Sequence, residues 1–385
     1  MTQEARAIDQ QLEGLEPEIR ALLDRHGFDR AHFTSLAQRL RRGFSNRVSG
    51  AVHLPEPGDI TELPPQGGPL RADLMWRGLA ALKAGECAIV VLAGGMATRM
   101  GGAVKALVEA LPGKTFLDFR LAEQTAIERA LGRLPPLWLM TSHATDAPIR
   151  RALEERRAAV RVGVFTQRLS LRLTESGELF CKDGQPSLYA PGHGDVIDAL
   201  RDGGLLHRFV ASGGRSVFIT NLDNLAGTLD PAILGFHLSH GHPVTSEVVD
   251  RLPSDRGGLP VRVDGALQVL EEPRLPADFD PASVGVFNIN SFWIDAACLL
   301  DQRPSFSDVA VRKQVDGANA VQFERLLNEL CASLPSRFLH VPRRGGGCRF
   351  LPVKDAAELE RHRPWIAAGA AFRGLFRPEQ PRVLR

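Results

Sequence analysis

A double glycine directly after an apolar run is the first feature of the sequence that could do chemistry. The stretch VVLAGGMATRMGGAVK occupies residues 90–105 and ends in Lys105. Glycines that follow a strand let backbone N–H groups approach a phosphate closely, and a lysine adds a compact charge for one phosphate oxygen. A tight turn after a buried strand would use the same glycines. The stretch lacks GxGxxG, and the GKT at 113–115 is not a Walker A loop because Val108 replaces its first glycine.

The motif TNLDN at 220–224 places Asp223 at the end of another apolar run. An aspartate at a strand end can bind a divalent cation whose other ligands are phosphate oxygens and water, which is the usual arrangement for Mg²⁺. The same aspartate could instead cap the next segment in an Asx turn. The motif alone leaves both interpretations open.

Two further stretches each contain one candidate residue. In YAPGHGDVIDAL at 189–200, glycines flank His193, whose imidazole could donate to a phosphate or a hydroxyl. A lone histidine in a turn is more often structural, although flanking glycines favour the close approach of a ligand. In GGGCRFLPVKD at 345–355, the strand-like RFLPVK ends in Lys354, which could clamp a phosphate or be a solvated edge residue.

Lysine is scarce in this chain, with six lysines against 41 arginines. Arginine therefore fills the usual surface role of lysine. Each remaining lysine becomes a better candidate for a task that suits a point charge, such as contacting a single phosphate oxygen. Chance and codon bias are the alternative explanation.

The segments that must position these residues alternate between strand and helix. This alternation predicts an α/β fold with a doubly wound, mostly parallel mixed sheet, in which ligands bind at the carboxyl ends of the strands. All four apolar runs end in glycine, polar or acidic residues, which favours a small-molecule site along one sheet edge. The predicted strands are 87–95, 136–142, 160–167 and 215–224, and the predicted helices are 115–133, 146–157, 195–213 and 230–241.

The flanking regions have different patterns. Residues 4–42 have helical spacing with one interruption at Gly27, which predicts two N-terminal helices, and 71–85 predicts another helix after a Pro/Gly-rich connector. After residue 243 the sequence is strand-rich, so we expect antiparallel strands that extend the sheet and complete a pocket. The expected parts are an N-terminal helical segment with its connector at 1–84, a catalytic domain at 85–360 and a C-terminal tail at 361–385.

Composition argues against several classes of protein. The net charge is +2, so no strong field points to nucleic acid or to a membrane surface as a partner. No apolar run approaches the roughly 20 residues that span a bilayer, and the acidic, polar N-terminus is unlike a signal peptide. The five cysteines include no CxxC and no close pair, so we expect a cytoplasmic protein without a cysteine-based metal site.

The order and spacing of the motifs resemble one known family. From about residue 85 to 355 the chain is similar to the UTP–glucose-1-phosphate uridylyltransferases, which are UDP-sugar pyrophosphorylases with a GT-A-like, Rossmann-like nucleotidyltransferase fold. It looks like a short form without the eukaryotic C-terminal β-helix, so we expect a monomer or a small homo-oligomer. The resembling blocks are LAGGMATRMGGAVK, KTFLDFRLAEQ, LMTSHATD, FTQ, PGHGDVIDAL, TNLDNLAGTLDPAILG, EVVDRLPSDRGGLPVR, LQVLEEPRLP, FNINSFWI, KQVDGANAVQFE and RFLPVK.

The resemblance implies a role for each motif residue. Asp223 would bind Mg²⁺, and the cations of Lys105, Lys354 and Arg99 would stabilise the reacting phosphates. The residues implied to hold the nucleotide are Leu92, Ala93, Gly94, Gly95, Gln167 and Gly192. The residues implied to hold the sugar phosphate are His193, Asn221, Gly258, Glu271, Asn288 and Asn290.

The implied reaction is attack of a sugar 1-phosphate oxygen on the α-phosphorus of UTP, which expels pyrophosphate. The nucleophile is already anionic at neutral pH, so no general base is needed. Positioning and cationic stabilisation should therefore carry the catalysis. We expect Mg²⁺ as cofactor and glucose 1-phosphate as the sugar substrate.

Two other functions stay open at this point. Arg99 matches the GTRLG pattern of the UDP-N-acetylhexosamine pyrophosphorylases, so the substrate could be N-acetylglucosamine 1-phosphate or another sugar 1-phosphate such as galactose 1-phosphate. A non-catalytic UDP-sugar-binding protein is the third possibility. The presence of Asp223, Lys105 and Lys354 argues against it, because binding alone does not need them.

Overall fold

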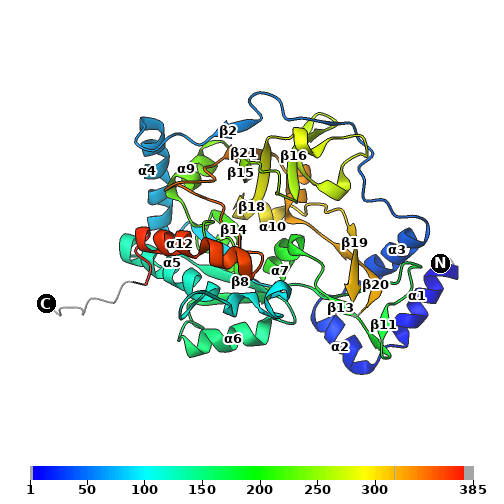
Figure 1. Cartoon of the computed structure of the whole chain (residues 1–385). Coiled ribbons are helices and arrows are strands. Elements are labelled where there is room, and N and C mark those ends of the chain that lie inside the picture. Colours follow the sequence, from blue (N-terminus) through cyan, green and yellow to red (C-terminus); the bar gives the residue numbers. More distant parts are fainter. Residues whose placement is uncertain (1–2, 316, 377–385) are drawn as a thin grey trace.

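An eight-stranded mixed sheet forms the centre of the computed structural model, which describes residues 3–315 and 317–376 (Figure 1). Strand β18 is antiparallel to both of its neighbours, and every other neighbouring pair in the sheet is parallel. The mostly parallel mixed sheet predicted from the sequence is therefore confirmed. In spatial order the strands are β2 (Ile60–Glu62), β21 (Ser336–His340), β15 (Val244–Asp250), β18 (Val286–Asp295), β14 (Ser216–Asn221), β3 (Cys87–Leu92), β8 (Leu137–Thr141) and β9 (Val162–Thr166).

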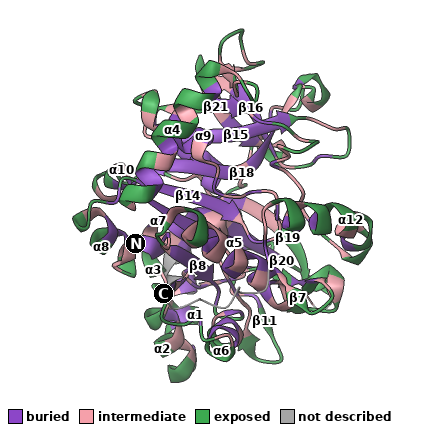
Figure 2. Ribbon diagram, turned by 90° about the vertical axis from the view of Figure 1, so that its left-hand side faces the viewer, coloured by how far each residue is buried: buried purple, intermediate pink, exposed green. Residues whose placement is uncertain are grey.

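The central strands are buried on both faces because helices cover both sides of the sheet. Successive residues of β3 alternate between two apolar clusters: Ile89 and Val91 belong to one, and Ala88 and Val90 to the other. Figure 2 shows the buried strands between helices whose outer sides are exposed. The helices of the first cluster are α4 (Pro69–Ala84), α5 (Phe116–Leu131), α6 (Asp146–Glu155), α9 (Pro231–Ser239) and α12 (Ala356–Phe372). Those of the second are α7 (Val196–Asp202), α8 (Leu205–Ala211), α10 (Ala296–Asp301) and α11 (Leu330–Ser333).

A third apolar cluster lies under the N-terminal helices, which lie apart from α4 in Figure 1. Side chains such as Ile8, Phe33 and Leu36 pack there against Leu171 and Phe323 from the body of the chain. The elements of this layer are α1 (Gln3–Glu13), α2 (Pro17–Arg25), α3 (Arg30–Arg41), the paired strands β10 (Ser170–Leu171) and β13 (Leu188–Tyr189), and the hairpin β19 (Val309–Val315) and β20 (Ala318–Glu324).

Smaller sheets complete the fold. The hairpin β16–β17 pairs with β1 in a separate three-stranded antiparallel sheet, and short hairpins follow β3 and lie between β10 and β13. Within the described ranges, no helix is both long and apolar enough to cross a membrane. The remaining strands are β1 (Val52–His53), β4 (Met96–Ala97), β5 (Ala103–Val104), β6 (Glu109–Leu111), β7 (Lys114–Thr115), β11 (Cys181–Lys182), β12 (Gln185–Pro186), β16 (Gly258–Val263) and β17 (Ala266–Glu271).

The structure corrects three expectations drawn from the sequence. The N-terminal segment contains three helices and not two, because Pro17 starts α2 and separates it from α1 in addition to the break at Gly27. The helix expected at 195–213 is divided into α7 and α8 at Gly204, which has φ 68°. RFLPVK forms no strand, only one bridge between Asn224 and Pro352, since a proline has no N–H for a ladder.

The parts expected from the sequence do not all end where a structural element ends. The boundary expected at residue 360 falls inside α12, which continues to Phe372. The remainder of the expected tail, from residue 377, lies outside the described residues. The antiparallel addition to the sheet that was expected after residue 243 is confirmed for β18, whereas β16 and β17 join the three-stranded sheet.

Candidate functional site

A cavity of about 400 Å³ opens at the carboxyl ends of β3 and β14. After β3 the chain adds β8 and β9 on one side of that strand, and then returns to place β14 on the other side. Such a switch in strand order leaves a crevice where open α/β sheets bind ligands. The cavity also has the volume typical of a small-molecule site. Its lining is Leu92, Gly94, Gly95, Met96, Lys105, Met140, Gln167, Ala190, Gly192, His193, Asn221, Leu222 and Asp223.

Nine of the residues singled out from the sequence line this cavity. They are Leu92, Gly94, Gly95, Lys105, Gln167, Gly192, His193, Asn221 and Asp223. The sequence analysis missed the apolar part of the wall, formed by Met96, Met140, Ala190 and Leu222. Each of the four lies within two residues of a candidate stretch or strand end, but an apolar residue there carries no signal that separates a ligand contact from core packing.

Gly94 is a glycine because the Gln167 side chain occupies the space beside it. A Cβ at Gly94 would lie 2.6 Å from Nε2 of Gln167. The Ser142 hydroxyl donates to the Gly94 carbonyl at 2.8 Å, and the Gln167 backbone N–H donates to Thr141 at 2.9 Å. The ends of β3, β8 and β9 are thereby tied together, with the largely buried Gln167 amide at the cavity wall.

Lys105 and Asp223 form an ion pair in the cavity wall. Nζ of Lys105 lies 2.5 Å from Oδ2 of Asp223, and about a fifth of each side chain is exposed (17% and 20%). The run from Gly95 to Lys105 is therefore long enough to bring the lysine to the end of β14. The backbone N–H of Val353 donates to the Asp223 carbonyl at 3.2 Å, so the neighbouring Lys354 also lies close to this turn, although it does not line the cavity.

The turn at Gly192 and His193 requires glycine. Gly192 has φ 97°, and a Cβ there would lie 2.5 Å from the carbonyl oxygen of Arg325. The backbone N–H of Leu327 donates to Nδ1 of His193 at 3.0 Å, and burial lowers the pKa of His193 to about 4. The imidazole is therefore neutral at pH 7 with its proton on Nε2, which can donate to a ligand in the cavity.

Three asparagines form a chain of hydrogen bonds that starts at the cavity wall. Nδ2 of Asn290 donates to Oδ1 of Asn221 at 2.8 Å, and the Asn290 backbone N–H donates to Oδ1 of Asn288 at 3.0 Å. Asn288 in turn donates to the Ser246 hydroxyl at 2.7 Å. Asn290 has φ 54°, and its Oδ1 is buried without a partner among the described residues. A buried amide oxygen without a partner marks a place where a hydroxyl of a ligand or a water molecule would supply the missing hydrogen bond.

Gly258 and Glu271 face each other across the β16–β17 hairpin. Nδ2 of Asn328 donates to Glu271 at 2.7 Å, and burial raises the pKa of the Glu271 carboxyl to about 7. A Cβ at Gly258 would lie 2.8 Å from the same Asn328 nitrogen. This pair and the asparagines Asn288 and Asn290 do not belong to the cavity lining.

Two other predicted residues lie outside the lining. Arg99 is exposed on the 3-10 turn Thr98–Met100, and Ala93 is fully buried behind the glycines. The structure therefore does not bring Arg99 into the cavity wall.

The site offers one carboxylate to a metal ion. In residues 3–315 and 317–376, no three His, Cys, Asp or Glu side chains are grouped so that they could hold a metal. A cation beside Asp223 would need oxygens from a bound ligand, which suits Mg²⁺, because Mg²⁺ commonly binds through one or two carboxylates and substrate phosphates. The donor set fits a Mg²⁺–nucleotide complex and not a resident metal.

Comparison with known proteins gives one consistent result. Residues 77–363 match the family described as UTP–glucose-1-phosphate uridylyltransferase. A uridylyltransferase of that name from Hordeum vulgare is 26% identical over 93% of this chain and 78% of its own length. One from Solanum tuberosum is 29% identical over 70% of this chain but only 60% of its own length.

Solved structures share the fold. A UDP-glucose pyrophosphorylase from Leishmania major, solved with UDP-glucose, has a TM-score of 0.74 at 23% identity over 93% of this chain and 78% of its own. A structure described as a UDP-N-acetylglucosamine pyrophosphorylase from Entamoeba histolytica has a TM-score of 0.66 at 16% identity over 80% of this chain and 84% of its own.

Proposed function

Because the chain belongs to the UTP–glucose-1-phosphate uridylyltransferase family, we propose that it makes UDP-glucose and pyrophosphate from UTP and glucose 1-phosphate. One observation at the site supports this proposal. At the switch point of the sheet, a single cavity brings together the backbone of Gly94, the amide of Gln167, the imidazole of His193 and the Lys105–Asp223 pair. These groups match a base, a sugar phosphate and a triphosphate, and they come from segments far apart in the sequence.

The reaction requires the protein to position the two substrates and to supply positive charge. The attacking oxygen of a sugar phosphate is already anionic, so the barrier comes from repulsion between the two substrates and from their alignment. Gly94 and Gln167 would fix the base and the first phosphates. His193 would donate from Nε2 to the sugar phosphate. Lys105 and Lys354 would neutralise the phosphates on either side of the reacting phosphorus.

The Mg²⁺ that we propose would be held by Asp223 together with phosphate oxygens of UTP. When bound, this ion withdraws charge from the phosphates. The position of Asp223 just after β14, where Lys105 compensates its charge, supports this proposal.

On the sugar side, the buried amide oxygen of Asn290 and the half-buried carboxyl of Glu271 have the character that a hydroxyl-binding site needs. A site with such groups rejects sugars that leave them unpaired. We also propose that the chain works in the cytoplasm as a monomer or a small homo-oligomer. Five free cysteines support the compartment, since disulfides are rare there.

Purified protein with Mg²⁺, UTP and a panel of sugar 1-phosphates tests the proposal. We expect the fastest pyrophosphate release with glucose 1-phosphate, and UDP-glucose as the product. Asp223→Ala should lower turnover by about 100-fold or more at an unchanged melting temperature, since it removes the charge that holds the cation in position. A higher rate with N-acetylglucosamine 1-phosphate would replace the proposed sugar. No release with any sugar would refute the catalytic function.

A further inference from the structure

The loop that carries Asp223 is held by an arginine that neither lines the cavity nor was singled out in the sequence. The loop joins β14 to α9, and Arg120 reaches it from helix α5. Nη2 of Arg120 donates to the carbonyls of Asn221 and Asn224, both at 2.8 Å, and Nη1 donates to the carbonyl of Gly227 at 2.8 Å. One guanidinium thus satisfies carbonyls on both sides of Asp223.

Arg120 is itself fixed in place. Its side chain is 2% exposed, and Nη1 also donates to Oε2 of Glu123, one turn further along α5, at 3.1 Å. The other oxygen of Glu123 accepts the backbone N–H of Leu229 at 2.9 Å. Every N–H of the two terminal nitrogens is used, and the Arg120–Glu123 pair holds the loop from its start at Asn221 to its end at Leu229.

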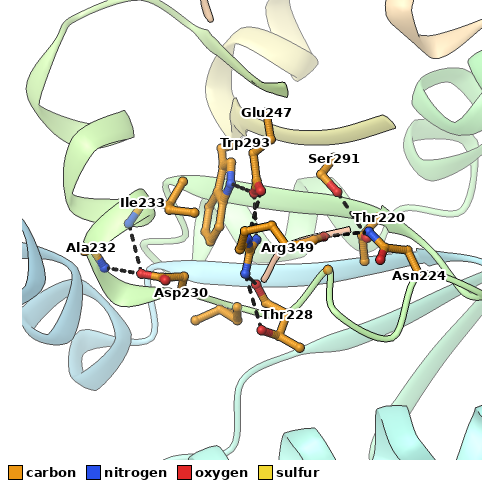
Figure 3. Close-up of polar contacts among 12 residues, drawn as sticks. Thr220, Asn224, Thr228, Asp230, Ala232, Ile233, Glu247, Ser291, Trp293 and Arg349 are labelled. Atoms are coloured by element: carbon orange, nitrogen blue, oxygen red, sulfur yellow. Dashed lines mark hydrogen bonds and ion pairs between the residues drawn. The ribbon is translucent and has the colours of Figure 1, made fainter. Parts of the chain in front are cut away.

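A second buried arginine supports the end of the same loop from another direction. Nη1 of Arg349 donates to the Thr228 carbonyl at 2.6 Å, while its other nitrogens are paired with Glu247 of β15 (Figure 3). The Asn224 side chain donates to the Arg349 carbonyl at 3.0 Å, as Figure 3 also shows. Arg349 contacts the loop beyond Asp223, whereas Arg120 donates to the carbonyls of Asn221 and Asn224 that flank it. The same two carbonyls also accept the backbone N–H groups of Asn224, at 3.3 Å, and of Gly227, at 3.0 Å.

We propose that Arg120 is a positioning residue for Asp223. A buried carbonyl must be paired, and a planar guanidinium pairs three of them at fixed distances and angles. The loop backbone is therefore held in one conformation, and this conformation fixes the position of the Asp223 carboxylate. Without Arg120 the Gly227 carbonyl loses the one partner it has among the described residues, and the carbonyls of Asn221 and Asn224 keep only the backbone N–H groups of Asn224 and Gly227. The loop then relaxes, and the carboxylate leaves the place where it meets Lys105. The inference rests on the proposed function only for its activity measurement.

Arg120→Met, with Arg129→Met as the matched control, tests this role. Arg129 lies on the same helix with an exposed side chain that donates to the Gly374 carbonyl, and it forms no hydrogen bond or ion pair with residues 221–229 among the described residues. We expect kcat of Arg120→Met to fall by about 10- to 100-fold, since a misplacement of about 1 Å costs about 100-fold. KM for UTP should change by less than about threefold, because Gly94 and Gln167 are untouched. Hydrogen exchange of the 221–229 amides should accelerate, and the control should change neither quantity by more than about twofold.

The outcomes separate this inference from the proposed function. A folded Arg120→Met protein with wild-type kcat and wild-type exchange in 221–229 would overturn the positioning role. If that variant does not fold, Arg120→Lys is measured in its place. Lysine keeps the charge but has no planar fork, so kcat should fall at least threefold with faster loop exchange, and wild-type values would overturn the role. If the wild-type protein releases no pyrophosphate at all, the proposed function fails, and the exchange comparison alone decides the role of Arg120.

Discussion

Glu247→Gln measures how strongly the buried ion pair with Arg349 holds the sheet and the loop beside it (Figure 3). Nε and Nη2 of Arg349 donate to the two Glu247 oxygens at 2.9 and 2.7 Å, and Nε1 of Trp293 donates to one of them at 2.8 Å. The Glu247 side chain is 0% exposed and that of Arg349 is 4% exposed. The substitution keeps the size of the side chain but leaves the guanidinium buried without a counterion.

The expected loss of the free energy of unfolding is large because both side chains are almost completely shielded from water. Removing one partner of a buried ion pair costs about 3–5 kcal/mol of the free energy of unfolding. A guanidinium cannot release its proton, whereas the carboxylate left by Arg349→Met can take one up. Glu247→Gln should therefore cost at least as much as Arg349→Met. The double variant removes both charges, so its loss should be smaller than the sum of the two single losses by about 1–3 kcal/mol.

Equilibrium unfolding in urea at neutral pH, followed by circular dichroism, gives the three losses. The matched control is Arg150→Met, because Arg150 forms an exposed ion pair with Asp146 on α6. That pair should contribute less than about 1 kcal/mol. The reasoning is refuted if Glu247→Gln stays within about 1 kcal/mol of wild type, or if the losses of the two single variants add up to that of the double variant.

Three further predictions concern the cavity and the residues around it. Gly94→Ala should leave the melting temperature almost unchanged but raise KM for UTP about tenfold, because its Cβ displaces the flexible end of Gln167; an unchanged KM would contradict the base-reading role. Gly192→Ala should lower the melting temperature as well as activity, because its Cβ meets the Arg325 carbonyl 2.5 Å away at a φ of 97°; wild-type stability would contradict this. Burial raises the pKa of Glu271 from 4.5 to about 7, so its ionisation opposes folding, and wild type should lose stability relative to Glu271→Gln as the pH rises through that interval. Equal melting-temperature differences at both ends of the interval would contradict the last prediction.

Much of the fold and nine of the thirteen residues that line the cavity could be predicted because their signals are local. The strands β3, β8, β9 and β14 are short apolar runs, and each one ends where the sequence changes to glycine or polar residues. Since carboxyl ends of parallel strands meet at one edge, the motifs after them were expected to converge. The cavity lining confirms this for Gly94, Gln167 and Asp223. Arg99, which the resemblance implied would stabilise the reacting phosphates, is instead exposed and outside the cavity lining.

What could not be predicted depends on contacts between distant segments. Arg120 lies about 100 residues before the carbonyls to which it donates, as the separations of 101 to 107 residues show. In the sequence it is one polar residue on a helix that is otherwise largely buried, and 41 arginines give no reason to choose it. Arg349 belongs to RFLPVK, which the sequence predicts as a strand, but its partners Glu247 and Thr228 lie 102 and 121 residues earlier in the chain. The role of a long side chain with many donors can be recognised only once its hydrogen-bond partners are known.

The separate apolar cluster under α1, α2 and α3 has a consequence for how the molecule responds to a ligand. Its buried side chains form a group apart from the two clusters of the large sheet, so we expect it to be a separate cooperative unit. At its edge the Leu169 N–H donates to the His26 carbonyl at 3.1 Å, and Leu169 lies two residues after Gln167 of the cavity wall. We expect that a ligand which orders the segment at Gln167 also stabilises this unit, and by reciprocal linkage the folded unit would then favour that ligand. We therefore expect the N-terminal helices to respond to a ligand bound beside Gln167, although they lie outside the cavity lining.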